Sequence, residues 1–204
     1  MPTAAITGSF LPLSMLTQLL AHFPDYTIVD RPTPDLIATY RELVPPELIE
    51  VWEQYGFGTF CDGYLKVVNP DDYADLLDDT YQLTSTPSPA PPVVLFATAM
   101  GDLIIWERGY LVQVNYRHGR AGNVGKSLKI FFRVLVEDSY LIERLEWEPY
   151  PAARERLGEP AFDECFGYMP LLALGGPETA DHLEKVKLRE HIALISEFIG
   201  VIER

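Results

Sequence analysis

The sequence predicts the α+β class, with an antiparallel sheet meander covered by helices in two closely associated parts. Three runs rich in Val, Ile, Leu and aromatic residues follow one another at residues 93–99, 102–107 and 110–116, separated by glycine-containing turns. This spacing is typical of a strand meander. After residue 127 the apolar residues recur at intervals of three and four, which indicates helices. With 48% hydrophobic residues, the chain of 204 residues can bury a substantial core.

A proline-rich segment divides the chain. Residues 85–92, STPSPAPP, hold four prolines among small residues, and such a segment cannot continue a helix or a central strand. We therefore predict an N-part, residues 1–92, that ends in this connector, and a C-part, residues 93–204, made of the strand meander and the helices that follow it.

The N-part is expected to hold three helices and a hairpin before its acidic segment. The first helix ends before Pro24 and has an apolar face of Met15, Leu16, Leu19 and Leu20. Thr33 and Pro34 suit the N-cap and first position of the second helix. The third covers residues 46–55, and Gly56 stops it. Residues 57–68 predict a hairpin that turns at Asp62-Gly63.

The C-part is expected to continue with helices after its three strands. The first has an apolar face at helical spacing, made of Leu128, Phe131, Phe132, Leu135 and Val136. Helical patterns follow at residues 139–147 and 152–158. The last helix, residues 188–199, carries Leu188, Ile192, Ile195 and Ile199 on one face and stops at Gly200.

Charge limits the classes of partner. The net charge is −14, which argues against direct binding of nucleic acid phosphates and suits a basic partner. Before Pro92 there are 13 acidic and three basic residues, and from there on 17 and 13, so the N-part carries most of the imbalance. No uncharged stretch is long enough to span a membrane, and the N-terminus lacks a basic region and a cleavage site for secretion. We expect a cytoplasmic protein without membrane contact.

The most acidic segment is NPDDYADLLDDTY, residues 69–81. Its five aspartates do not alternate and no glycine provides a turn, so a calcium loop is disfavoured. A single helix is predicted instead, with Asn69 as N-cap, Pro70 in the first turn and the aspartates on one side. Tyr73, Leu76, Leu77 and Tyr81 fall on the other side and suit the core. The helix dipole accounts for the first two aspartates, Asp71 and Asp72. The later ones, Asp75, Asp78 and Asp79, form either a solvated face or a contact surface.

Two other segments almost form known sites. Residues 118–127, HGRAGNVGKS, resemble a phosphate-binding loop, but Arg120 stands where that motif needs glycine. We expect a flexible loop before a helix at Ser127, while a small-molecule or nucleotide-binding regulatory domain remains an alternative function. Cys165 could act as a nucleophile only beside a histidine. The histidines have no zinc-ligand spacing, so we expect no metal, cofactor or catalytic site.

The residues also resemble a known family. WEQYGFGTFCDGYLKVVNPDDYADLL, residues 52–77, looks like the GAD-like domain. LFATAMGDLIIWERGYLVQVNYRHG, residues 95–119, and the segments LGEPAFDECFGYMPLLALGG and HLEKVKLREHIALISEFIG are similar to the C-terminal domain that accompanies it. Together they resemble immunity proteins of type VI secretion DNase effectors.

This resemblance implies a non-enzymatic protein that binds and blocks a cognate nuclease toxin. A nuclease presents basic residues to DNA, so an acidic face can cover them. The candidate contact residues are Asp72, Asp75, Asp78 and Asp79, with a second group at the end of the third strand, Tyr116, Arg117 and His118. Sequence leaves the identity of the toxin and the oligomeric state open.

Overall fold

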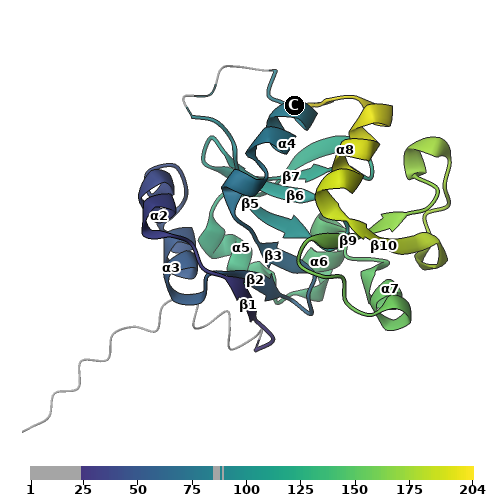
Figure 1. Ribbon diagram of the computed structural model, residues 1–204, viewed down its shortest axis with the longest axis horizontal. Coiled ribbons are helices and arrows are strands. Elements are labelled where there is room, and N and C mark those ends of the chain that lie inside the picture. The colour runs from purple at the N-terminus through teal and green to yellow at the C-terminus, as the bar shows by residue number, and fades with distance from the viewer. Residues whose placement is uncertain (1–23, 85–87, 89) are drawn as a thin grey trace, which may run out of the picture.

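In the computed structural model of the protein, residues 24–84, 88 and 90–204 are described (Figure 1). Its centre is a seven-stranded sheet in the order β1-β2-β3-β5-β6-β7-β8, in which every neighbouring pair is antiparallel. The strands are β1 (Thr27–Asp30), β2 (Phe57–Phe60), β3 (Leu65–Val67), β5 (Val93–Thr98), β6 (Leu103–Glu107), β7 (Tyr110–Asn115) and β8 (Arg120–Gly125). The helix expected before Pro24 and half of the proline-rich connector, residues 85–87 and 89, lie outside the described residues.

The N-part and the C-part share this sheet. Strand β3 pairs with β5 across the connector, with Leu65 opposite Thr98 and Val67 opposite Phe96. The two parts are therefore joined by backbone hydrogen bonds as well as by side-chain packing. The predicted α+β class with an antiparallel meander is confirmed, whereas the division at residue 92 stays a prediction.

Helices cover both faces of the sheet (Figure 1). The helices are α2 (Pro34–Tyr40), α3 (Pro46–Tyr55), α4 (Ala74–Thr80), α5 (Leu128–Val134), α6 (Asp138–Leu145), α7 (Tyr150–Leu157) and α8 (Leu188–Ile199). Side chains of α3, α5, α6 and α7 pack into one core, and those of α4 and α8 pack into the other. Burial on both faces explains why the central strands are apolar at nearly every position.

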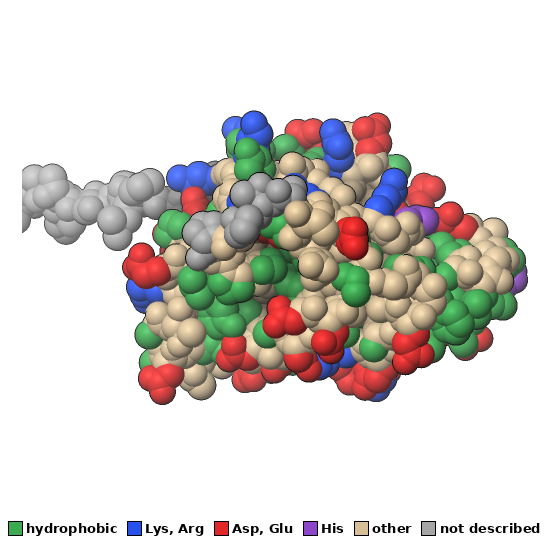
Figure 2. All heavy atoms as spheres, turned by 90° about the horizontal axis from the view of Figure 1, so that it is seen from above, with side chains coloured by type: hydrophobic (Ala, Val, Ile, Leu, Met, Phe, Trp, Pro, Cys, Tyr) green, Lys and Arg blue, Asp and Glu red, His purple; other side chains and the backbone are tan. Residues whose placement is uncertain are grey.

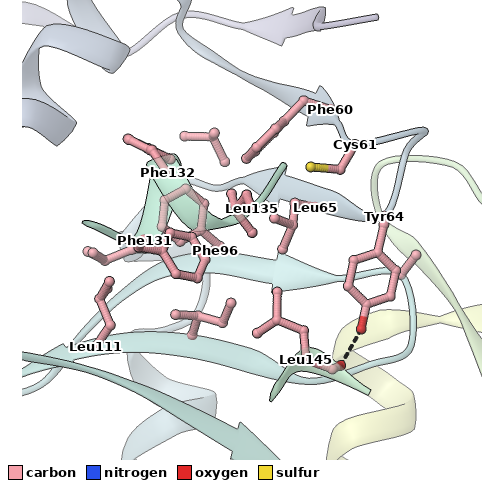
Figure 3. Close-up of a cluster of buried hydrophobic side chains, with 14 of the residues drawn as sticks. Phe60, Cys61, Tyr64, Leu65, Phe96, Leu111, Phe131, Phe132, Leu135 and Leu145 are labelled. Atoms are coloured by element: carbon pink, nitrogen blue, oxygen red, sulfur yellow. Dashed lines mark hydrogen bonds between the residues drawn. The ribbon is translucent and has the colours of Figure 1, made fainter. Parts of the chain in front are cut away.

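A bulge in β5 assigns its residues to the two cores. The register shifts between Val94 and Phe96, so Leu95 and Phe96 both enter the core of α3 and α5. Val94 and Ala97 face α4 and α8. Figure 3 shows the first core, where Phe96 lies among Phe131, Phe132 and Leu65, and the Tyr64 hydroxyl donates to the Leu145 carbonyl at 2.5 Å. That buried hydrogen bond ties the sheet to the end of α6.

The helix boundaries and the hairpin mostly match the sequence prediction. Thr33 caps α2 by accepting from the Leu36 amide, and Gly56 ends α3 with φ of 75°. The β2–β3 hairpin turns through Cys61, Asp62 and Gly63, which all have positive φ. The four C-part helices occur where the apolar spacing placed them, and Gly200 ends α8.

The predicted single helix over the acidic segment is wrong. A 3₁₀ turn, η1 (Pro70–Asp72), is followed by a break at Tyr73, and α4 begins at Ala74. Asn69 does cap the first turn by accepting from the Asp71 amide. Short 3₁₀ turns are common at the start of α-helices. The sequence of a single turn does not show whether its backbone hydrogen bonds span three residues, as in a 3₁₀ turn, or four, as in an α-helix.

The flexible loop predicted at residues 118–127 is also wrong, because most of it forms strand β8. The strand pairs with β7 from Asn115 opposite Arg120 to Leu111 opposite Gly125. Glycines lower strand propensity, but pairing with a neighbouring strand overrides that preference at a sheet edge. Ser127 then caps α5 as expected.

Two small sheets were not predicted from the sequence. Strands β9 (Glu164–Tyr168) and β10 (Leu183–Lys187) pair antiparallel. Their connector, residues 169–182, includes the 3₁₀ turns η2 (Leu172–Leu174) and η3 (Ala180–His182) and projects from one end of the molecule (Figure 1). Strand β11 (Ile202–Glu203) pairs in parallel with β4 (Tyr81–Gln82). The chain end is thereby fixed beside α4.

Candidate functional site

The acidic segment divides into a buried and an exposed side, as the sequence predicts. Tyr73, Leu76, Leu77 and Tyr81 are buried in the core below α4. All five aspartates are exposed. The tyrosines are therefore core residues, and only the carboxylates of this segment are presented to solvent.

The first two aspartates have partners inside the protein. The Tyr40 hydroxyl donates to Asp71 at 2.6 Å and links α2 to η1. The Asn69 amide donates to Asp72 at 3.2 Å within the same turn. Both carboxylates therefore have structural contacts, and Asp72 is a weaker contact candidate than the sequence suggested.

Asp75 joins α4 to α8. The Arg189 guanidinium donates to both carboxylate oxygens of Asp75, at 2.9 and 3.1 Å, and lies over the Tyr73 ring. These hydrogen bonds lower the pKa of the Asp75 carboxyl and raise the pKa of Arg189. Sequence spacing does not reveal this partner, because it lies more than 100 residues further along the chain.

Asp78 and Asp79 differ from the other three. They are exposed on the last turn of α4, and within the described residues their side chains have no ion pair or hydrogen bond. Carboxylates near a helix C-terminus are disfavoured by the helix dipole. A basic partner would compensate for that cost, so this pair is the strongest part of the acidic contact candidate.

The second candidate group lies mostly inside the protein. Tyr116 is fully buried, and its hydroxyl lies 2.7 Å from the Thr80 hydroxyl. Arg117 is buried and donates to Asp102 at 2.6 Å, while Gln113 donates to the same carboxylate at 3.1 Å. These side chains have internal roles, and contact of Tyr116 or Arg117 with a partner stays a prediction without support from their position.

His118 is the exposed end of this group. It lies between two carboxylates, 2.9 Å from Glu146 at the end of α6 and 2.9 Å from Glu178 in the β9–β10 connector. The hydrogen bond to Glu146 raises the pKa of His118 and lowers the pKa of Glu146 to about 2. Asn115 and Arg120 also donate to Glu146, so this carboxylate fastens α6 to the β7–β8 turn.

One buried lysine was not singled out by sequence analysis. Lys66 in β3 donates to the carbonyls of Ala161 at 2.7 Å, Phe162 at 3.1 Å and Glu164. Burial lowers its pKa to about 8. The lysine holds the segment before β9 against the sheet, so its role is structural. The only sequence feature that could have indicated this buried lysine is its position within the apolar run YLKVV.

Cys165 does lie near a histidine, but in the interior. Cys165 and His191 both lie against Gly101 and both are buried. Burial raises the pKa of the Cys165 thiol to about 12 and lowers the pKa of His191 to about 4. A nucleophilic cysteine needs the opposite shift, toward the thiolate. The surroundings of Cys165 therefore do not support nucleophilic catalysis.

Other kinds of site have no support in the described residues. Among residues 24–84, 88 and 90–204, no group of three or more His, Cys, Asp or Glu side chains is arranged to hold a metal ion. Over the same residues, none of the helices has the length and apolar character needed to cross a membrane. The glycine-rich segment that favoured nucleotide binding is strand β8, whose backbone pairs with β7 instead of curling around a phosphate.

Comparison with known proteins gives two family matches and a structural neighbour. The GAD-like domain matches residues 14–118, and the C-terminal domain of the T6SS immunity protein Tdi1 matches residues 125–199. The fold is similar to the crystal structure of Atu4351 from Agrobacterium tumefaciens, with a TM-score of 0.69 and 18% identity over 87% of this chain and 86% of that chain. No curated protein matches the chain.

Proposed function

Because the chain belongs to the GAD-like family and carries the C-terminal domain of the type VI secretion immunity protein Tdi1, we propose that it neutralises a cognate DNase toxin by binding it. The family supports the immunity role and a toxin partner. The nuclease activity of that toxin is part of the proposal. It rests on the acidic balance of the chain and on the resemblance of its motifs to immunity proteins of DNase effectors.

The exposed pair Asp78 and Asp79 carries the proposal for how the toxin is recognised. These carboxylates have no partner within the described residues, while Asp71, Asp72 and Asp75 do. A DNase presents Lys and Arg side chains to DNA phosphates, so a surface with unpaired carboxylates can attract and cover it. Such charge mainly raises the association rate.

Inhibition is proposed to be stoichiometric and without catalysis. The thiol of Cys165 is buried, and Lys66, Asp102 and Arg117 are engaged in contacts within the protein, which supports a role without catalysis. We propose that the protein acts in the cytoplasm, where a toxin delivered into the cell would reach DNA. Covering the basic surface of the toxin would then protect that DNA.

The proposal is tested with the effector encoded beside this protein. Both proteins are co-expressed, with a tag on the effector, and DNA cleavage by the purified effector is measured with and without added protein. We expect co-purification and loss of cleavage. The matched control is an acidic protein of similar size and charge, which should not protect DNA. Undiminished cleavage at molar excess would contradict the proposal.

A further inference from the structure

Helix α8 exposes large apolar side chains that its packing does not use. Its buried face consists of Leu188, His191, Ile192 and Ile195. On a different side, Leu194 is 42% exposed and Phe198 is 51% exposed. Val201, just after the Gly200 cap, is 47% exposed. An exposed aromatic ring next to exposed aliphatic side chains is unfavourable in water unless something else covers it.

The exposed residues form a stripe along one flank of the helix. At about 100° per residue, Leu194 and Phe198 lie about 40° apart, and Phe198 lies about 180° from Arg189. Arg189 faces α4 through Asp75. The apolar stripe therefore lies on the flank of α8 that is turned away from α4.

The β9–β10 connector extends the apolar surface on that flank. Turn η2 packs against α8, where Leu172 and Ala173 line a small cavity together with His191 and Ile195. Leu174, the last residue of the turn, is 57% exposed. Figure 2 shows hydrophobic side chains gathered at the end of the molecule from which this connector projects in Figure 1.

The surroundings of the stripe are acidic. Glu190 and Glu197 are exposed on the outward side of α8, between the stripe and α4. Asp78 and Asp79 are exposed on α4, which contacts α8, and the nearby cation Arg189 is already paired with Asp75. A partner that covers the stripe must therefore tolerate or prefer negative charge around it. This charge disfavours a second copy of the chain, since each copy has a net charge of −14.

We propose that the flank of α8 formed by Leu194 and Phe198 is the anchoring surface for the toxin, which presents an apolar pocket bordered by Lys or Arg. This inference rests on the proposed function and adds the part of the surface that sets affinity. Carboxylates steer association, but slow dissociation requires apolar side chains that are fully desolvated in the complex. The ring of Phe198 is the central anchor and Leu194 its neighbour.

The test compares two double variants that lose comparably exposed apolar side chains in different places. Leu194→Ser with Phe198→Ser removes the stripe. Ile130→Ser with Ile142→Ser is the matched control, because these residues of α5 and α6 are comparably exposed. Binding of the neighbouring effector is followed by surface plasmon resonance, and thermal unfolding shows that both variants fold. The single variant Phe198→Arg adds a like charge against the basic border and gives an independent measurement.

We expect the stripe variant to dissociate at least about 10-fold faster, with an association rate within about twofold of wild type, and the control to match wild type. Unchanged dissociation of both the stripe variant and Phe198→Arg overturns this inference alone. Failure of the wild-type protein to bind the effector overturns the proposed function itself. A wild-type dimer that the stripe variant loses would assign the flank to a second copy and also overturn the inference.

Discussion

Replacement of Arg117 by methionine tests whether this residue is structural or a direct contact. The Arg117 guanidinium and the Asp102 carboxylate are buried and 2.6 Å apart. Methionine keeps much of the side-chain volume but leaves Asp102 as a buried carboxylate whose only side-chain partner, among the described residues, is the Gln113 amide. Removing one member of a buried ion pair costs about 3–5 kcal/mol, because the remaining charge is left without compensation.

The assay is urea and thermal unfolding of the full chain. A protein of this size loses about 2–4 °C of Tm per kcal/mol, so the Tm of Arg117→Met should fall by about 6–20 °C. Adding Asp102→Leu removes the unpaired charge and should restore at least half of the lost free energy of unfolding. At a temperature where Arg117→Met is folded, toxin binding should stay within about twofold of wild type.

Two results would contradict a structural role for Arg117. A free-energy loss below about 1 kcal/mol for Arg117→Met would show that the pair is not buried as described. A fully folded Arg117→Met protein that binds the toxin at least about 10-fold more weakly would show that Arg117 contacts the partner after all, as the sequence allowed.

The exposed charges give two further predictions. The double variant Asp78→Lys with Asp79→Lys should slow toxin association several-fold and flatten the salt dependence of the association rate in stopped-flow measurements. The control, Glu42→Lys with Glu50→Lys, makes an equal charge change at exposed positions near α2 and on α3 and should have a smaller effect. Equal effects of the two variants would mean that only net charge matters. The raised pKa of His118 means that its ion pairs stabilise the fold fully below the unfolded pKa of about 6.5 and lose this effect as pH rises through the folded pKa. In urea unfolding, the free energy of unfolding of wild type should therefore exceed that of His118→Gln by more at pH 5.5 than at pH 8.5. A difference in free energy that does not change with pH would contradict this prediction.

Much of the fold follows from local sequence pattern. The spacing around Phe131 and Phe132 and the Thr33 and Gly56 caps define helices because each signal lies within a few residues. Strand β8 does not follow from its own sequence, since its two glycines disfavour a strand and only the pairing with β7 creates one. The β9–β10 hairpin is likewise held by pairing across a connector of 14 residues, a distance over which local pattern carries no register information.

The candidate site shows the same limit. Sequence correctly separates the buried Tyr73 and Tyr81 from the exposed aspartates, although a break at Tyr73 and strand β4 at Tyr81 replace the single helix that was predicted. It does not reveal that Asp75 is paired with Arg189, or that Tyr116 and Arg117 are directed inward at the end of β7. These contacts depend on which elements become neighbours in the fold, which the sequence does not show. Among the five aspartates, Asp78 and Asp79 are the ones without a side-chain partner in the described residues, and the exposed apolar flank of α8 is likewise visible only in the structure.

Titration of the effector with this protein measures the proposed stoichiometric inhibition itself. DNA cleavage by a fixed concentration of the effector is measured while the protein is added in increasing molar ratio. Stoichiometric inhibition predicts a linear fall of activity that reaches zero at a fixed ratio and stays there. Cleavage that continues undiminished beyond equimolar protein, under conditions in which wild type is folded, would contradict the account.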